Sequence, residues 1–234
     1  MIKVIMFDLD GTLLPMDQDK FVKVYFYGLG KKLEPLGYDV KKVADAVLSG
    51  VIAMTKNDGE QTNEVTFWNK FAEILGDGVR QHTELFEDYY NNEFQKVKEV
   101  CGFSSQAKEA ILTAKEKGLR VVLATSPMFP KIATESRMRW AGLEPEDFEL
   151  YTTYEDYSFA KPSLGYYKDV ISRLGVLPEE CVMVGNDVLE DMISSELGIK
   201  TFLLTDCLIN RKNLDYSKYE QGDFSKLIDF IKNL

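Results

Sequence analysis

The sequence predicts an α/β fold, in which a Rossmann-like parallel sheet carries helices on both faces and a helical bundle is inserted near the N-terminus. Short apolar runs alternate with amphipathic stretches after residue 104, the rhythm of strand–helix–strand units in a parallel sheet. From residue 16 to residue 100 the periodicity stays helical, with no convincing strand. We therefore expect a core domain of residues 1–15 and 101–234 and a helical domain of residues 16–100.

The composition limits the kinds of partner. Asp and Glu number 38 against 28 Lys and Arg, which gives a formal net charge of -10. Such acidity opposes nucleic-acid binding, which needs a basic face, and a phosphate ligand would have to be held by a local cation. No apolar run is long enough for a membrane span, and no signal peptide precedes the first predicted strand. With three widely spaced cysteines and no disulfide framework, we expect a cytoplasmic protein with no membrane partner.

The first predicted strand ends at two aspartates. A short apolar run rich in strand formers consists of Ile2, Val4, Ile5, Met6 and Phe7, and Asp8 and Asp10 follow it. Side chains alternate along an extended segment, so Asp8 and Asp10 are expected to face the same side, with Gly11 allowing the chain to turn and Thr12 continuing away. Like charges held close need a shared cation or proton, which favours a metal-assisted carboxylate site.

The inserted helices are predicted from apolar residues at spacings of three and four. They cover residues 17–34, residues 39–55, a stretch from Thr62 that ends before Gly76, and residues 79–98. Four amphipathic helices with short connections are typical of a small bundle. Their aromatic side chains, including Trp68, Tyr89 and Tyr90, are expected in its core.

The second half of the chain supplies the remaining elements. A helix is expected to end at Gly118, and further helices are expected at residues 131–141, 163–174, 188–197 and 224–234. Strands are expected at residues 119–124, 148–151, 181–184 and 199–204.

Polar residues follow several of these strands. Ligands of open parallel sheets bind outside the carboxyl ends of the strands, so the polar side chains there are expected to converge in one crevice. In chain order they are Asp8, Asp10, Thr125, Ser126, Lys161, Asn186, Asp187 and Asp191. Lys161 precedes Pro162, which favours extended geometry just ahead of a helix.

This order of motifs resembles the haloacid dehalogenase superfamily, in its phosphoglycolate phosphatase-like or β-phosphoglucomutase-like branch. The motifs that carry the resemblance are Asp8-Leu-Asp10-Gly11-Thr12, Thr125 after an apolar run, Lys161-Pro162, and Gly185-Asn-Asp187-Val-Leu-Glu-Asp191. The resemblance implies a magnesium-dependent phosphatase of a small phosphorylated metabolite. It also implies that residues 16–100 are the helical cap that many members insert between the first two motifs.

The chemistry of phosphoryl transfer fits these residues. Asp8 is expected to be the nucleophile that forms an aspartyl phosphate, as the resemblance also implies. Asp10 takes, by its motif position, the part of the acid and base that protonates the leaving oxygen and later activates water. Thr125 or its neighbour Ser126 would bind a phosphoryl oxygen, and Lys161 would balance the charge of Asp8 and of the transferred group.

The expected cofactor is Mg²⁺, which prefers oxygen ligands. Its protein ligands would be Asp8, the backbone carbonyl of Asp10 and Asp187, with Asp191 in support. The usual family pattern has the aspartate directly after the glycine, whereas Asn186 intervenes here, so either Asn186 or Asp187 could approach the metal.

Other interpretations stay open at this point. Asp187 could cap a helix with Glu190 as its capping-box partner, and both readings could hold together. A phosphotransferase such as a sugar-phosphate mutase is the near alternative to a phosphatase, and a noncatalytic sensor of a phosphorylated ligand is a more distant one. The sequence does not indicate the substrate or the oligomeric state.

Overall fold

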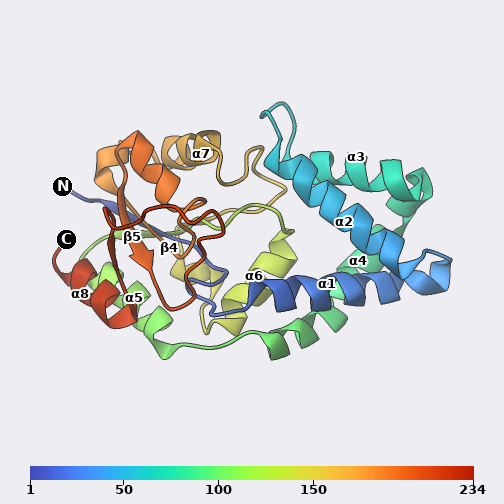
Figure 1. Ribbon diagram of the computed structural model, residues 1–234, viewed down its shortest axis with the longest axis horizontal. Helices are drawn as coiled ribbons and strands as arrows, with labels where there is room; N and C mark the ends of the chain where they lie inside the picture. Colours follow the sequence, from blue (N-terminus) through green and yellow to red (C-terminus); the bar gives the residue numbers. More distant parts are fainter.

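A computed structural model describes residues 1–234 and contains one six-stranded sheet, in which all strands are parallel (Figure 1). The strand order is β3-β2-β1-β4-β5-β6. The strands are β1 (Val4–Phe7), β2 (Arg120–Leu123), β3 (Leu150–Tyr151), β4 (Cys181–Gly185), β5 (Lys200–Leu204) and β6 (Glu220–Gly222). The first strand therefore lies in the middle of the sheet, between β2 and β4, where the strand order reverses.

Alternate residues of β1 belong to two separate cores. Ile5 and Phe7 pack in a large cluster that includes α5 (Ser105–Glu116), α6 (Lys131–Trp140) and α8 (Phe224–Lys232). Val4 and Met6 pack on the opposite face against α7 (Leu164–Leu174), which lies across the sheet from α5 and α8 in Figure 1. Burial on both faces explains why the strand is apolar at every position. The predicted parallel sheet with helices on both faces is confirmed.

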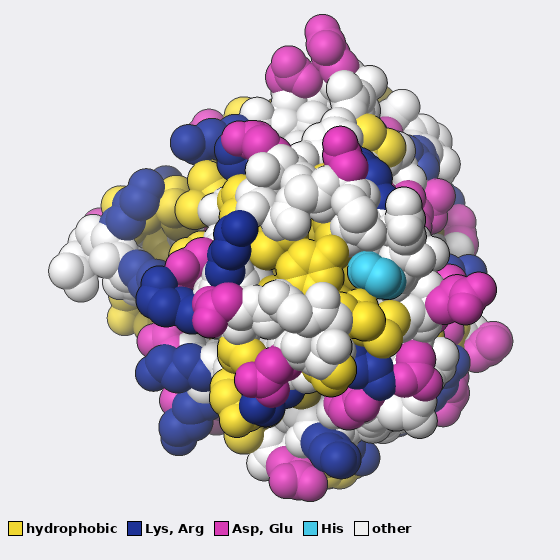
Figure 2. Space-filling view, turned by 90° about the vertical axis from the view of Figure 1, so that its right-hand side faces the viewer, with side chains coloured by type: hydrophobic (Ala, Val, Ile, Leu, Met, Phe, Trp, Pro, Cys, Tyr) yellow, Lys and Arg dark blue, Asp and Glu magenta, His cyan; other side chains and the backbone are white.

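Four α-helices lie between β1 and α5 in the sequence and gather at one end of the molecule (Figure 1). They are α1 (Gln18–Leu33), α2 (Val40–Thr55), α3 (Asn63–Leu75) and α4 (Thr83–Asn91). The side chains of Asp17, Asp39 and Thr62 cap the first three by accepting hydrogen bonds from backbone amides. Figure 2, which faces this end, shows hydrophobic side chains among charged groups of both signs. The division into residues 16–100 and the rest stays a prediction.

The helical end and the sheet end share a continuous hydrophobic cluster. The rings of Phe94 and Trp140 lie 5.0 Å apart, and those of Tyr25 and Phe129 lie 5.4 Å apart. Trp140 also donates a hydrogen bond of 3.1 Å from Nε1 to Oε1 of Gln95. Aromatic contacts thus join α1 and the 3-10 helix Glu93–Val100 of the helical end to α6 and the segment before it.

Two predicted helices are wrong in detail. The helix expected at residues 79–98 is broken into a 3-10 helix (Asp77–His82), α4, and a second 3-10 helix (Glu93–Val100). Asn92 ends α4, and its side chain donates to the backbone oxygen of Asp88 at 3.1 Å, a local bond that competes with helix propagation.

The helix expected at residues 188–197 is instead a set of turns followed by a short 3-10 helix (Met192–Leu197). The Asp191 side chain folds back onto the amide of Asp187 at 2.9 Å, and Ser194 Oγ donates to the Asp191 carbonyl at 2.7 Å. Strand β6 was not predicted, because three residues of mixed polarity carry no strand pattern. No helix of the chain combines the length and the apolar character needed to cross a membrane.

Candidate active site

The carboxyl ends of three neighbouring strands meet at one level. Phe7 at the end of β1 pairs with Leu123 of β2 and with Val184 of β4. The next residues, Asp8 and Ala124, continue the ladder through hydrogen bonds from Asp8 N to Val184 O (2.9 Å) and from Ala124 N to Phe7 O (2.7 Å). This register brings three of the four sequence motifs to the same edge of the sheet.

Asp8 lies at the centre of a buried charge network. Lys161 Nζ donates to Asp8 Oδ1 at 2.9 Å and to Asp191 Oδ1 at 2.6 Å, and Lys161 is only 1% exposed. Burial by itself lowers the pKa of Lys161, but the carboxylates of Asp191 and Asp8 outweigh it and hold that pKa well above the ordinary value. Lys161 is therefore a fixed cation between two carboxylates.

The hydroxyl of Thr12 also reaches Asp8, which corrects the expectation that Thr12 leads away from the site. Thr12 Oγ1 lies 3.0 Å from Asp8 Oδ2 and 2.9 Å from Asn186 Oδ1. The turn after Asp10 folds the chain back, with Leu14 N bonded to Leu9 O at 2.8 Å, and this return directs Thr12 inward.

Two glycines allow close packing at the first and fourth motifs. Gly11 has a φ of +85°, and a Cβ there would lie 2.3 Å from Asn186 Nδ2. A Cβ on Gly185 would lie 2.2 Å from the carboxyl carbon and oxygen of Asp191. A larger residue at position 11 would push the two motifs apart, and one at position 185 would displace the Asp191 side chain within the fourth motif.

Asp10 pairs with Arg137, a residue that the sequence analysis missed. Arg137 is fully buried on α6, its Nη1 donates to Asp10 Oδ2, and its guanidinium stacks 4.0 Å from the ring centre of Phe129. Burial raises the pKa of Asp10 above its ordinary value, and Arg137 offsets part of that rise. The signal in the sequence was a lone arginine on the apolar face of a helix, since buried arginines require an anionic partner.

In the fourth motif, Asp187 makes the hydrogen bonds expected of a capping residue, although turns and not a helix follow it. The second residue of the expected capping box is replaced. Asp187 Oδ1 accepts hydrogen bonds from the amides of Leu189 (2.7 Å) and Glu190 (2.9 Å). The reciprocal bond to the Asp187 amide comes from Asp191 rather than from Glu190. Asp191 thereby joins this turn to Lys161.

The second motif places two hydroxyls at the same edge. Thr125 is buried, and its carbonyl accepts hydrogen bonds from the hydroxyls of Thr152 and Tyr166, which fix the end of β2. Ser126 Oγ is buried and has no hydrogen-bond partner. A buried hydroxyl without a partner is unfavourable unless a ligand supplies one.

These groups form the floor of a cavity of about 520 Å³ between the sheet edge and the four helices. We use the term floor for the polar lining side chains that follow β1, β2 and β4. They are Asp8, Asp10, Thr125, Ser126, Asn186, Asp187, Glu190 and Asp191. The structure thus brings together all the predicted site residues, with Lys161 directly behind Asp8. Trp68 and Tyr90, which were expected only in the bundle core, also line the cavity.

The floor suits a divalent cation with oxygen ligands. Five of its side chains are carboxylates, whereas Lys161 and Arg137 are the cations bonded to them. Burial, with Asp187 and Asp191 beside it, raises the pKa of Glu190 to about 8, and Asp10 Oδ1 is buried without a partner. No three His, Cys, Asp or Glu side chains enclose a metal position by themselves. This pattern fits Mg²⁺, which takes one or two protein carboxylates and completes its shell with water and phosphate.

Known proteins are similar to this chain in sequence. A family described as haloacid dehalogenase-like hydrolase matches residues 2–205. Glyceraldehyde 3-phosphate phosphatase of Methanocaldococcus jannaschii is 27% identical over the whole chain and 99% of its own length. The protein of that name from Pyrococcus furiosus is 23% identical over the whole chain and 93% of its own length.

Solved structures share the fold. A HAD phosphatase from Thermococcus onnurineus superposes with a TM-score of 0.61 at 20% identity, over 98% of each chain. CbbY from Rhodobacter sphaeroides, in complex with phosphate, gives 0.59 at 19% identity, over 97% of this chain and 96% of its own. The family match covers most of this chain, and the chain belongs to the haloacid dehalogenase-like hydrolases.

Proposed function

We propose that the protein is a magnesium-dependent phosphatase that hydrolyses a phosphorylated small molecule through an aspartyl phosphate. The observation that supports this most directly is Asp8, which lies on the floor of the cavity with one carboxylate oxygen fixed by Lys161 and the other by Thr12. The names of the two curated relatives, both phosphatases, support the same activity.

Asp8 would act as the nucleophile. Its carboxylate oxygen forms a bond to phosphorus while the bond between phosphorus and the substrate's alcohol oxygen breaks. Lys161, held between Asp8 and Asp191, would fix the position of the Asp8 carboxylate and would offset the charge of the transferred phosphoryl group. The hydroxyls of Thr125 and Ser126 would bind phosphoryl oxygens, and the unpaired Ser126 Oγ is suited to this.

Asp10 would move the proton in both steps. In the first step it protonates the departing alcohol oxygen, and in the second it removes a proton from the water that attacks the aspartyl phosphate and releases phosphate and Asp8. The raised pKa of Asp10, caused by burial, suits a proton donor. Arg137 holds Oδ2 of this carboxyl and leaves Oδ1 without a protein partner.

Mg²⁺ would be held by Asp8, the backbone carbonyl of Asp10 and Asp187, and when bound it would neutralise charge on the phosphoryl oxygens. Asp187 is preferred to Asn186 because both ends of the Asn186 amide are in use. Asn186 Oδ1 faces Thr12, and Nδ2 donates to Cys207 O at 2.7 Å. Asp191 supports the site by bonding the Asp187 amide and Lys161. The helices of residues 16–100 would act as the cap over this site.

The test is phosphate release from p-nitrophenyl phosphate by wild-type protein and by Asp8→Asn. We expect activity that needs Mg²⁺, is abolished by a chelator, and falls by at least about 10³-fold in Asp8→Asn, since a lost nucleophile removes the covalent route. Asp39→Asn is the matched control, because Asp39 caps α2 and asparagine caps equally well. Full activity in Asp8→Asn would overturn the assignment, and transfer of phosphate to an added alcohol rather than to water would indicate a phosphotransferase.

A further inference from the structure

The upper part of the cavity differs in chemistry from its floor. Of 29 lining residues, 16 are hydrophobic. We use the term apolar wall for six of them, which come from α1, α2, α3 and the segment before α6: Val22, Phe26, Leu48, Val51, Trp68 and Phe129. These side chains face the space that the alcohol part of a phosphoester would occupy once its phosphate is on the floor.

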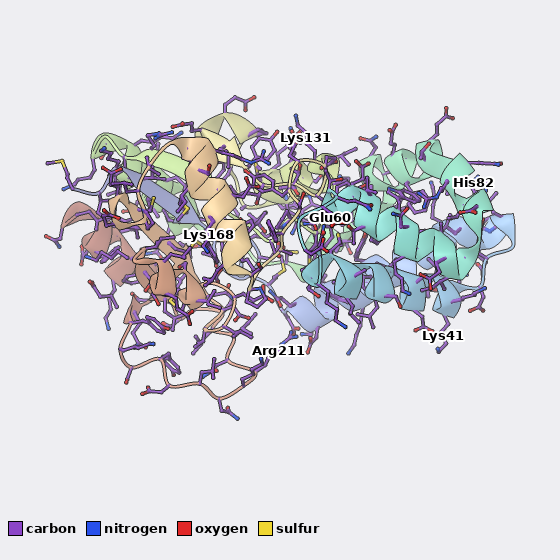
Figure 3. The ribbon with its side chains drawn as sticks, turned by 90° about the horizontal axis from the view of Figure 1, so that it is seen from above. Lys41, Glu60, His82, Lys131, Lys168 and Arg211 are labelled. Carbon is purple, nitrogen blue, oxygen red and sulfur yellow. The ribbon has the colours of Figure 1, made fainter.

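The wall offers few hydrogen-bond partners to a ligand. The hydroxyls of Tyr25 and Tyr90, which also line the cavity, lie 2.7 Å apart and share a hydrogen bond with each other. The charged lining residues away from the floor are exposed at the rim, where Arg211 pairs with Asp19 at 3.4 Å. Figure 3 shows Arg211 at the place where the sheet end meets the first of the four helices.

We propose that the substrate is the phosphate monoester of a bulky apolar alcohol, aromatic or long-chain aliphatic, rather than of a triose or another polyhydroxylated sugar. This inference rests on the proposed phosphatase activity. A polyhydroxylated body would lose water from its hydroxyls without gaining partners from the wall, whereas an apolar body would gain from burial. The cavity volume of about 520 Å³ lies within the range that holds drug-sized ligands, which is about 300–1,000 Å³.

The first experiment measures kcat/KM for a series of primary n-alkyl phosphates from ethyl to octyl. All of these release a primary alcohol, so leaving-group chemistry stays nearly constant and only apolar length changes. We expect kcat/KM to rise with length, by up to about fourfold per methylene until the cavity is filled. Pentyl phosphate and glycerol 3-phosphate have the same number of non-hydrogen atoms, and we expect the first to be better by about tenfold or more.

Matched variants test whether the wall is responsible. Val22 and Val24 both lie on α1 and are both 38% exposed, but only Val22 lines the cavity. We expect Val22→Asp to abolish most of the gain with chain length and Val24→Asp to leave it unchanged. Leu48 and Ile52 on α2 form a second pair, 49% and 45% exposed, of which only Leu48 lines the cavity. Leu48→Gln should reduce the gain and Ile52→Gln should not.

A binding measurement separates this inference from the proposed activity. Octylphosphonate cannot be hydrolysed, and its chain should change the fluorescence of Trp68, which lines the cavity, but not that of the buried Trp140. We expect the signal to persist in Trp140→Phe and to vanish in Trp68→Phe. Octylphosphonate binding with no turnover of any ester would overturn the proposed phosphatase activity but would support an apolar binding site.

Three results bear against the apolar substrate. Phosphate release without any dependence on chain length would overturn the apolar substrate and keep the phosphatase. Equal or better turnover of glycerol 3-phosphate or glyceraldehyde 3-phosphate would do the same. Neither binding nor turnover would overturn both.

Discussion

The floor and the apolar wall of the cavity are built in different ways. The floor comes from residues that directly follow adjacent strands, and its charges are buried and paired, as between Lys161, Asp8 and Asp191. The wall comes from side chains spread over three helices and a loop, and these side chains offer a ligand apolar contacts. Under the proposed function, short motifs at strand ends carry the reaction and dispersed helical positions select the substrate, so the two properties should be separable by mutation.

The largest effect is expected from removal of the buried cation on the floor. Lys161→Met would leave Asp8 and Asp191 facing each other without compensation, and we expect a loss of about 3–5 kcal/mol in the free energy of unfolding. Urea unfolding at pH 7.5 without metal measures this loss. Lys3→Met is the control, because the Lys3–Glu180 pair lies at the surface, where solvent screens it, and its loss should change the free energy of unfolding little. Similar losses in both variants would show that Lys161 stabilises the fold no more than a surface lysine does.

Most of the floor could be predicted because its geometry follows from the periodicity of a strand. Asp8 lies at the end of a central strand, and parallel register brings Thr125 and Asp187 to the same edge. The direction of Thr12 could not be predicted, because it depends on the turn that returns Leu14 to Leu9. The helix expected after Asp187 failed because a buried carboxylate, Asp191, bonds the backbone there.

The wall and Arg137 could not be predicted for a related reason. Helical periodicity indicates that Trp68 and Arg137 lie on apolar faces, but it does not identify the element that each face contacts. Arg137 finds Asp10 across 127 positions of sequence, and Trp68 becomes part of the cavity only because α3 is placed above the sheet edge. Both facts belong to tertiary packing, which a single sequence does not encode in its local pattern.

Loss of Arg137 should slow the hydrolysis of esters whose leaving oxygen needs a proton from Asp10 more than that of esters whose leaving oxygen does not. In Arg137→Met, Asp10 loses the guanidinium that positions it, and we expect kcat for alkyl phosphates to fall by about 10- to 100-fold. p-Nitrophenyl phosphate should be affected much less, because its leaving oxygen needs little protonation. Arg137→Lys should restore part of the loss. Arg139→Met on the same helix is the control, since Arg139 pairs only with the exposed-side carboxylates of Glu135 and Glu144. Equal losses on both substrates would argue against a positioning role.

A change behind the wall should alter selection without altering the reaction. Gly50 lies on α2, and a Cβ there would lie 2.5 Å from the ring of Phe67, which lines the cavity. Gly50→Ala should push this ring into the cavity and lower kcat/KM for octyl phosphate by a few-fold, about 1 kcal/mol of packing cost, while p-nitrophenyl phosphate keeps its kcat. Gly78→Ala, with only Tyr38 Oη as near as 4.0 Å, is the control. An equal loss for both esters would mean that floor and wall are not independent.

The smallest effect concerns the pH dependence of stability at the floor. Burial and the neighbouring Asp187 and Asp191 raise the pKa of Glu190 from 4.5 to about 8, so the folded protein retains a proton that the unfolded chain releases. Its stabilising contribution is therefore complete below about pH 4.5 and is lost as the pH rises through about 8. Glu190→Gln in chelator should match the wild type at pH 4.5 and melt a few degrees higher at pH 9, with Mg²⁺ narrowing that gap.

Asp147, which does not line the cavity, has a pKa shifted in the opposite direction and serves as a comparison. Burial raises its pKa, but Lys108, Lys115 and the Glu144 amide outweigh burial and hold the pKa below its ordinary value. Asp147→Asn should therefore destabilise the protein at neutral pH, by about 1 kcal/mol or less, and the loss should disappear on acidification. Between pH 4.5 and pH 9, Asp147→Asn should melt below the wild type throughout, whereas Glu190→Gln should match the wild type at pH 4.5 and melt above it towards pH 9. If Glu190→Gln melted below the wild type at pH 9, as Asp147→Asn should, the carboxylates of the floor would not be short of positive charge, and the case for a cation there would lose its electrostatic basis.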